Sequence, residues 1–447
     1  MIFQEIYERA PYWMQNIAVY MMGCLIQRRR YNKQFYKELK RFEEKEYDQN
    51  RELHDFLRAI RNVKAYKAVY SPQIVDKLDA KDCDVLSILA QFPIIGKVDV
   101  KARIDDYVNK EYTGKRFTMR TSGTTGSGLA FPFPVEFENK QWAIWWQCRR
   151  KWGIQLDTWC GWFGGKRMIS PQYNKPPYWR VNHPGHQVMY SSYHLTRETI
   201  KFFYEDIKRR ELRWIHGYPS HIAKLAALIL EEEQPLHCIK WITTGAEGLV
   251  GNQVKLIKKA FPDAMIGEHY GQNEGVAIMN RDSEKGWETV DNFSYIEFIP
   301  VDQDNPDLCH IIGTGFFNRA FPLVRYDTGD LATVERGSDG RITKILSIDG
   351  RTSNTVKQPS GHEITEAALS IVLHDFESIK EAQFHQVASD FVELWVVKGK
   401  DYSAEDEKNL MASMRKAFDD NMKVSIKYVE AVERTKTGKL RLVITES

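Results

Sequence analysis

Strand-like and helix-like segments alternate between about residues 195 and 275, and this alternation constrains the fold more than any other feature. Three short segments rich in β-branched and aromatic residues predict strands: RWIH (213–216), CIKWITT (238–244) and AMIGEHY (264–270). Helix-like apolar spacing occurs in IKFFYEDIKRR, in SHIAKLAALILEEE with Ser220 as its expected N-cap, and in GNQVKLIKKAF. Strands that alternate with helices over short connections predict a parallel sheet covered by helices. Ligands bind such sheets at the loops that follow the carboxyl ends of the strands.

A smaller unit of mixed strands and helices is expected after Asp349-Gly350-Arg351, where the pattern changes. Two strand candidates, EAQFHQV (381–387) and FVELWVV (391–397), precede a helix for which Ser403 and Asp406 form a capping-box pair. The apolar residues of that helix fall on one face: Leu410, Met414 and Phe418.

The chain is too long for one compact core, since it has 447 residues. The predicted fold class is therefore α/β, with a large N-terminal domain of helix-covered, mainly parallel sheets and a small α+β C-terminal domain. We expect residues 1–85 to form a helical region of the large domain, 86–349 to form its ligand-binding part, and 350–447 to form the small domain.

The segment TSGTTGSG, residues 121–128, is rich in glycine and hydroxyl side chains. Glycines allow successive backbone N–H groups to curl around an anion, and hydroxyls add donors, so a polyphosphate fits such a loop. It is not a Walker P-loop, because no Gly-Lys-Ser/Thr sequence closes it. The alternative is a flexible turn. The candidate phosphate-binding residues are Thr121, Ser122, Gly123, Thr124, Thr125 and Gly126.

Several further motifs accompany this loop along the chain. They are FPIIGKVDV (92–100), HGYPS (216–220), TTGAEGL (243–249), YGQNE (270–274), FPLVRYDTGD (321–330), DGR (349–351) and TGKLR (437–441). Each is weak alone, because a carboxylate after a strand is commonly a turn residue and a C-terminal lysine is commonly solvated. In this order they resemble the adenylate-forming superfamily of acyl-CoA synthetases, adenylation domains and luciferases. The closer likeness, from about residue 85 to the end, is to the phenylacetate–CoA ligase branch and its CapK-like proteins of capsular polysaccharide gene sets.

The resemblance implies an AMP-forming ligase, which uses ATP and Mg²⁺ to convert a carboxylic acid into acyl-AMP with release of pyrophosphate. It assigns catalysis to Lys439, Glu274 and Arg351, with Glu274 as the Mg²⁺ ligand, a role that suits a hard carboxylate oxygen. Residues 121–128 would hold the β- and γ-phosphates. Ala246, Glu247 and Tyr270 would frame the adenine, and Asp330 would bind the ribose. Gly245 and Gly271 would be further nucleotide-binding residues. The small domain would be a mobile lid that carries Lys439 to the α-phosphate.

The acceptor of the acyl group stays open between CoA, an amine and a hydroxyl such as that of a sugar. The resemblance favours surface-polysaccharide assembly, and the alternative is a phenylacetate-like aryl- or acyl-CoA ligase of small-molecule catabolism. A non-catalytic binding subunit is a third reading, against which the intact Glu274, Asp330 and Lys439 speak.

Two positions depart from the family pattern. Ser353 stands where the hinge between the domains usually has Asp or Lys, and a full domain swing is therefore less certain. The segment AIMNRDSEKGWETVDNF (277–293) has neither Cys nor His, so we predict no zinc.

The acid-binding pocket is harder to assign from the sequence. Aromatic side chains that follow one another closely would suit stacking on an aryl or sugar acid, but core packing is the favoured interpretation: Trp142, Trp145, Trp146, Trp152, Trp159, Trp162 and Phe163. His216 is at least as well explained by a structural role as by a catalytic one.

Composition narrows the partners and the compartment. The 63 basic and 60 acidic residues give a net charge of +3, which points to no nucleic acid or other polyelectrolyte. Six singly spaced cysteines, an acidic start and the lack of a long apolar run suggest a cytoplasmic protein without a membrane span. The oligomeric state is open.

One apolar segment, Ile17 to Ile26, is followed by Arg28, Arg29 and Arg30. A helix packed on the body of the protein is favoured for it, and a weak contact with an anionic membrane surface is the alternative.

Overall fold

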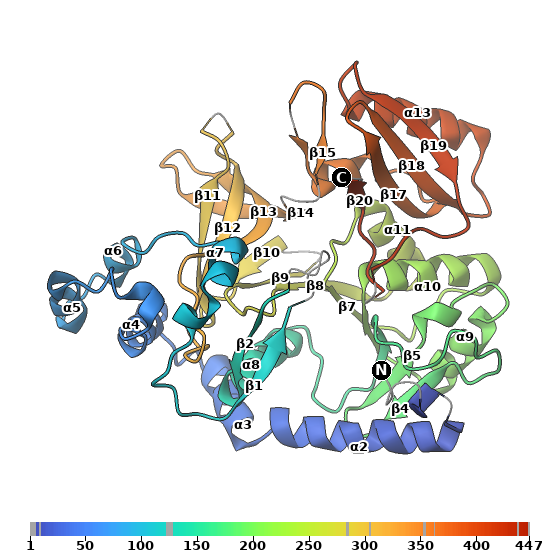
Figure 1. Ribbon diagram of the computed structural model, residues 1–447. Coiled ribbons are helices and arrows are strands. Elements are labelled where there is room, and N and C mark those ends of the chain that lie inside the picture. Colours follow the sequence, from blue (N-terminus) through green and yellow to red (C-terminus); the bar gives the residue numbers. More distant parts are fainter. Residues whose placement is uncertain are drawn as a thin grey trace.

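The computed structural model describes residues 6–8, 10–121, 128–282, 286–303, 305–351, 355–361, 363–435 and 438–445. Its centre is a twelve-stranded sheet with the order β11-β12-β13-β14-β10-β9-β8-β7-β6-β3-β5-β4 (Figure 1). In chain order its strands are β3 (Cys160–Phe163), β4 (Trp179–Asn182), β5 (Gln187–Tyr190), β6 (Trp214–Gly217), β7 (Trp241–Gly245), β8 (Met265–Gly271), β9 (Ile278–Asp282), β10 (Gly286–Thr289), β11 (Ser294–Pro300), β12 (Leu308–Gly315), β13 (Tyr326–Arg336) and β14 (Ile342–Arg351).

Five neighbouring strands, β5, β3, β6, β7 and β8, run parallel to one another. The helices between them in the chain are α9 (Ile200–Arg209), α10 (Pro219–Glu232) and α11 (Gly251–Ala260). Their buried apolar side chains share one core with the strands, in which Leu225 and Ile257 join Ile215 and Ile242. The mixed α/β class predicted from the alternation is confirmed.

Helix α10 begins two residues earlier than the sequence suggests. Pro219 is its first residue and Tyr218 its N-cap, so the prediction that Ser220 caps the helix is wrong. The fixed φ of proline suits the first helical position, where the missing N–H has no helical partner in any case. Ser220 therefore lies inside the first turn, and its backbone N–H is available to a group outside the helix.

Beyond β8 the sheet continues in antiparallel order through β9, β10, β14, β13, β12 and β11. No helix is needed between strands that reverse direction, and short turns join several of them. Between β13 and β14, for example, Gly340 adopts φ +78°, a left-handed conformation that suits glycine. The strand–helix periodicity of residues 195–275 carries no information about this second half of the sheet.

The N-terminal part of the chain is helical and packs into the same core as the antiparallel strands. Its helices are α2 (Tyr12–Arg30), α3 (Lys33–Glu43), α4 (Gln49–Ala59), α5 (Pro72–Asp79), α6 (Val85–Leu89) and α7 (Lys97–Ala102), with 3₁₀ turns η1 (Lys64–Tyr66) and η2 (Ile104–Tyr107). Phe35, Phe56 and Tyr66 are buried together with Phe293 and Phe321. Helix α8 (Val135–Lys151) contributes Phe137 and Ile144 to the same core. The 3₁₀ turn η3 (Ser192–His194) follows β5.

The C-terminal part has its own hydrophobic core and its own four-stranded sheet, with the order β19-β18-β17-β20 (Figure 1). Its elements are β15 (Val356–Lys357), β16 (Glu363–Ile364), α12 (Glu366–Val372), β17 (Ile379–Ala388), β18 (Phe391–Lys398), α13 (Ala404–Ala417), β19 (Lys423–Tyr428) and β20 (Val443–Thr445). The capping box of Ser403 and Asp406 is confirmed at the start of α13, and Leu410 and Met414 are buried as predicted.

Helix α2 packs on the body, as favoured from the sequence, but through a narrow strip. Gln15, Val19 and Gly23 are buried against the sheet edge at β4, while most of the apolar residues between Ile17 and Ile26 are exposed. Within the ranges described above, no helix combines the length and the apolar character needed to cross a membrane.

Gly217 at the end of β6 permits a close approach between strands. A Cβ at this position would lie 2.4 Å from the carbonyl oxygen of Phe163 on β3. We therefore expect Gly217→Ala to lower the free energy of unfolding by about 1–3 kcal/mol, measured by denaturant titration. Gly248→Ala is the matched control, because a Cβ there meets nothing within 4 Å. Equal stability of the two variants would contradict this account of the strand contact.

Candidate active site

The Thr- and Gly-rich segment joins two strands of a hairpin outside the large sheet. Strands β1 (Arg116–Arg120) and β2 (Ala130–Pro134) pair antiparallel. The Thr121 N–H donates to the Leu129 carbonyl oxygen over 2.9 Å, and the Leu129 N–H donates to Thr121 Oγ1 over 2.9 Å, so these two residues close the base of the loop. The other predicted phosphate-binding residues lie outside the described residues: Ser122, Gly123, Thr124, Thr125 and Gly126.

Tyr270, Asp330 and Arg351 come together from three strands. Asp330 on β13 stands directly opposite Arg351 on β14, and Arg351 Nε lies 3.6 Å from Asp330 Oδ1. The Tyr270 hydroxyl at the end of β8 donates to Asp330 Oδ2 over 2.8 Å and accepts from Gln272 Nε2 at 2.7 Å. Burial raises the pKa of Asp330, and the charge of Arg351 and the hydrogen bond from Tyr270 oppose that rise. The carboxylate is thus held in a fixed position by its neighbours.

The residues that end β7 and β8 form the next part of the site. Gly245 is the last residue of β7, and Ala246 follows with φ +71°, a conformation that strains any residue with a side chain. Gly271 ends β8 and pairs with Ile278 of β9. The loop after β8 approaches the base of the hairpin, because Asn273 Nδ2 lies 3.4 Å from the carbonyl oxygen of Arg120.

Glu274 has a cationic neighbour that the sequence analysis missed. The Ile95 N–H donates to the Arg325 carbonyl oxygen over 3.1 Å, which fixes the segment 92–100 beside the start of β13. Lys97 at the start of α7 thereby comes within the field of Glu274 and Arg351. Burial raises the pKa of Glu274, and the positive charges of Lys97 and Arg351 oppose that rise. Lys97 lies in the motif FPIIGKVDV, but nothing in that motif marks the lysine as a site residue.

Lys439 comes to this site from the far end of the chain. Its Nζ lies 5.8 Å from the centre of the Tyr218 ring. Burial lowers the pKa of Lys439, the carboxylates of Glu247 and Asp330 raise it, and Arg351 lowers it further. Lys439, the lysine predicted to be catalytic, therefore lies among the residues predicted to bind the nucleotide. Its neighbours Lys436 and Thr437 and the hinge residue Ser353 lie outside the described residues.

Glu247 ties the C-terminal segment to the large sheet. Its Oε2 accepts from the Ser220 N–H in the first turn of α10 at 3.2 Å, and its Oε1 accepts from the Leu440 N–H at 2.6 Å. Burial raises the pKa of Glu247, and these hydrogen bonds oppose that rise. In this arrangement both oxygens of the residue predicted to frame the adenine contact backbone.

Two further side chains hold the same segment, and sequence reasoning gave neither a role. Arg434 donates to Ser220 Oγ at 2.9 Å and to the Gly438 carbonyl oxygen at 3.1 Å, and it pairs with Glu381. His221 is buried with its ring nitrogens 3.1 Å from the carbonyl oxygens of Phe163 and Gly438. Residues from β3, α10 and the C-terminal segment therefore meet at one place.

Three cations and three carboxylates come together in the site. Lys97, Arg351 and Lys439 act on the carboxylates of Glu274, Asp330 and Glu247. One carboxylate such as Glu274 is enough protein for Mg²⁺, which usually keeps several waters and binds phosphate oxygens as well. No set of three or more His, Cys, Asp or Glu side chains is gathered in the described ranges as for a metal held by protein alone. The absence of zinc stays a prediction.

Most of the aromatic residues considered for an acid pocket pack in the cores. Trp142, Trp146 and Trp152 belong to or line the core beside α8, and Phe163 stacks on Tyr190 at 4.8 Å. Among these indoles lies Arg149, which is 5% exposed, with its guanidinium 5.1–5.7 Å from the rings of Trp142, Trp146 and Trp214. The pKa of Arg149 is lowered by burial.

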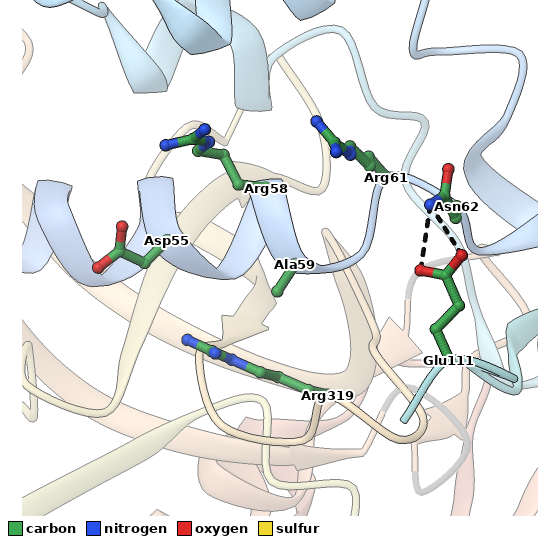
Figure 2. A pocket seen from close by; sticks show the side chains of 7 residues that line it. All are labelled: Asp55, Arg58, Ala59, Arg61, Asn62, Glu111 and Arg319. Atoms are coloured by element: carbon green, nitrogen blue, oxygen red, sulfur yellow. Dashed lines mark hydrogen bonds between the residues drawn. The ribbon is translucent and has the colours of Figure 1, made fainter. Parts of the chain in front are cut away.

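A hollow on the surface, shown in Figure 2, lies apart from these residues. Asn62 donates to both carboxylate oxygens of Glu111 there, at 2.9 and 3.0 Å. The hollow contains none of the predicted site residues, and its lining is mostly charged: Asp55, Arg58, Ala59, Arg61, Asn62, Glu111 and Arg319.

Known proteins share both the sequence pattern and the fold. The family model of the CapK C-terminal domain matches residues 356–446. Over 451 residues, the chain is 25% identical to Protein CapK of Staphylococcus aureus, covering 98% of each protein. The predicted resemblance to CapK is confirmed. Crystal structures of 2-hydroxyisobutyryl-CoA ligase in the postadenylation state, with R3-HIB-AMP and with 2-HIB-AMP, share the fold with a TM-score of 0.63 at 15% identity, covering 89% of each chain.

Buried His221 makes the stability sensitive to acid. Burial and the nearby charge of Arg434 lower its pKa to about 4, whereas an imidazole in an unfolded chain has a pKa of about 6.5. Between these values the unfolded chain binds more protons, so the stability is fully present above about pH 6.5 and falls as the pH decreases. We expect the melting temperature of His221→Gln to fall less steeply over this range, by about 1–2 °C per pH unit.

The control for this prediction is His237→Gln, because the side chain of His237 is 68% exposed. It should keep the wild-type slope in the same calorimetric scans. A slope in His221→Gln equal to that of the wild type would contradict the assignment of the acid sensitivity to the buried imidazole.

Proposed function

We propose that this protein is an AMP-forming ligase that activates a carboxylic acid with ATP and transfers the acyl group to an acceptor. The observation that carries the proposal is the position of Lys439, which lies over Tyr218 and within the field of Asp330, Arg351 and Glu247. A cation brought from the far end of the chain to this set suits a reaction between two anions. The fold shared with an acyl-CoA ligase and the likeness to CapK support the same activity.

In the first half-reaction, a carboxylate oxygen of the acid attacks the α-phosphorus of ATP. A bond from that oxygen to phosphorus forms, the bond from the α-phosphorus to the bridging oxygen breaks, and pyrophosphate leaves. The acid is already ionised at neutral pH, so no general base is needed. Lys439 and Arg351 offset the repulsion by placing positive charge where negative charge gathers. Asp330 holds the ribose, and Mg²⁺ bound through Glu274 would add positive charge at the phosphates.

In the second half-reaction the acyl group passes from the adenylate to the acceptor, and AMP leaves. We propose that residues 350–447 form a lid that moves for this step, over the large domain made by 86–349 and the helical region 1–85. The contacts of Glu247, Arg434 and His221 with the C-terminal segment are the ones that such a movement would break.

We propose an acceptor in surface-polysaccharide assembly, either an amine or a hydroxyl, because the sequence motifs resemble those of CapK-like proteins of capsular polysaccharide gene sets. The fold shared with 2-hydroxyisobutyryl-CoA ligase supports the alternative acceptor, CoA. Acid-dependent release of pyrophosphate, followed with CoA, an amine or a sugar added in turn, separates the two. An acceptor is identified when it consumes the adenylate and releases AMP.

Lys439→Ala tests the proposed activity. The variant loses the positive charge that offsets repulsion between the carboxylate and the α-phosphate, so acid-dependent release of pyrophosphate should fall by about 10²–10³-fold. Nucleotide affinity, measured by calorimetry, should change little, because Asp330 and Arg351 remain. Transfer from supplied acyl-adenylate to the acceptor should be spared if the lid moves away in the second step.

The matched control is Lys416→Ala, which removes an exposed cation from α13 of the same domain. It should release pyrophosphate at the wild-type rate. If Lys439→Ala and Lys416→Ala are equally active with an acid that the wild type uses, the proposed role of Lys439 is wrong.

We also propose a class for the acid, which carries an anionic or hydroxyl group at its far end. The side chain of Arg149 makes no hydrogen bond or ion pair within the described part of the chain, and its buried Nε has no partner there. A buried charge without a counter-ion is costly, and the three indole faces offset only part of that cost. A negatively charged or oxygen-bearing ligand group would complete the environment.

Strand β6 connects this arginine to the site of reaction. Trp214 at its start contacts Arg149, and Tyr218 just after its end contacts Lys439. Four residues of strand span about 13 Å, so a small acid with its carboxylate at Lys439 can direct its other end toward Arg149. His216 lies between, with its Nδ1 3.0 Å from the Thr243 carbonyl oxygen and 2.8 Å from Thr243 Oγ1.

Arg149→Met tests this assignment with matched pairs of acids that differ only in the distal group. Loss of a charge-assisted hydrogen bond should reduce pyrophosphate release by about 10–100-fold for the anionic or hydroxylated acid, while the apolar acid is unaffected or improved. Arg150→Met, which changes the exposed neighbour on α8, is the control. An equal loss for both acids would contradict recognition of the distal group by Arg149. The proposed adenylation would still stand, because it is tested separately by acid-dependent pyrophosphate release in the wild type.

A further inference from the structure

Helix α2 presents apolar side chains on the face that points away from the protein. Trp13, Ile17, Met21 and Leu25 recur every four residues and are 62%, 50%, 61% and 61% exposed. Figure 1 shows α2 as a long blue helix along the lower edge of the molecule. A surface helix normally turns its apolar stripe inward and its polar face outward, and α2 does the opposite.

The packing of α2 explains why this face cannot turn inward. The helix approaches the sheet edge along Gln15, Val19 and Gly23, where a Cβ on Gly23 would meet the Asn182 side chain. Asn16 Oδ1 accepts from the Val181 N–H of β4 at 3.1 Å, and Gln15 Oε1 accepts from Arg180 Nε at 2.7 Å. These polar contacts fix the rotation of the helix, so the apolar face is held outward.

Cations gather at the carboxyl end of the same helix. Between Tyr12 and Lys40 the sequence has six basic residues and one acidic residue, Glu38, which is buried. Arg29 and Arg30 pair with Glu138. Arg28, Lys33 and Lys37 are exposed and form no ion pair within the ranges that the structure describes. An exposed apolar face that ends in unpaired cations matches the layers of an anionic bilayer surface.

We propose that α2 lies in the headgroup layer of an anionic membrane, with Trp13, Ile17, Met21 and Leu25 inserted and Arg28, Lys33 and Lys37 against lipid phosphates. The helix is about 28 Å long and lies flat on the body, as a peripheral contact requires. A second copy of the chain fits less well, because α2 has no acidic residue to meet the cations of another α2. This proposal does not depend on the reaction that the protein catalyses.

Sedimentation of the full-length protein with vesicles tests the proposal. Binding should occur with vesicles of phosphatidylcholine mixed with phosphatidylglycerol, should be at least about tenfold weaker with phosphatidylcholine alone, and should weaken as salt screens the charges. A variant with Ile17→Ser, Met21→Ser and Leu25→Ser should lose most of the binding. A variant with Arg28→Ser, Lys33→Ser and Lys37→Ser should lose the preference for anionic lipid.

The control is Ile371→Ser, which removes an apolar side chain that is 72% exposed on α12, and it should bind vesicles as the wild type does. Melting temperatures of all variants establish that they fold, since only exposed side chains are changed. Absence of binding to anionic vesicles, or binding undiminished in both α2 variants, would overturn the proposal. The proposal would also be overturned if the wild type binds no vesicles but self-associates, and if the apolar variant abolishes that self-association. A second copy of the chain would then cover the exposed face of α2.

Discussion

The carboxylate of Glu247 is the contact on which the arrangement of the candidate site depends. It accepts one backbone N–H from the first turn of α10 and one from Leu440, so it links the large sheet to the segment that carries Lys439. Hydrogen bonds to an ionised acceptor are stronger than neutral ones, and a helix amino end favours a negative charge. Burial works against ionisation by raising the pKa of Glu247. The two hydrogen bonds therefore position Lys439. The cost of desolvating Glu247 offsets part of their free energy, so the link can be broken at a smaller cost.

The register of β13 and β14 sets the other half of the site. A shift of one residue would turn Asp330 or Arg351 to the opposite face of the sheet, and the contact of Asp330 with Tyr270 would be lost. Lys97 depends in turn on the pairing of Ile95 with the residues that precede Asp327. Cations and carboxylates that are neighbours only through such long-range pairing favour each other's charged forms, which opposes the effect of burial on their pKa values. This is the arrangement that a site needs if it is to bind a polyanion without rebuilding itself.

The elements that local pattern determines were predictable, and the ones that distant contacts determine were not. The parallel strands β6, β7 and β8 and the capping box of Ser403 follow from periodicity and from side chains a few residues apart. Ser220 was misassigned, because the preceding proline takes the first helical position. Lys97, His221 and Arg434 carry no local signal for the site, since the partners that bring them there, Glu274, Gly438 and Ser220, are about 180 to 220 residues away in the chain. The apolar run in α2 correctly predicts a helix packed on the body, but composition does not say which face of that helix is buried.

Arg149 and α2 illustrate one physical argument applied to opposite environments. Among the described residues, the guanidinium of Arg149 is enclosed by three indoles and pairs with no carboxylate, and the apolar side chains of α2 are held in water by the polar contacts of Gln15 and Asn16. Both arrangements cost free energy in the isolated protein. Neither feature stabilises the fold, since a methionine at position 149 or serines along α2 would occupy the same positions at a smaller cost in free energy. Features of this kind are understandable when a ligand supplies the missing partner. In the proposals made above, an anionic or hydroxyl group of the acid would supply it in the first case, and the surface of an anionic bilayer would supply it in the second.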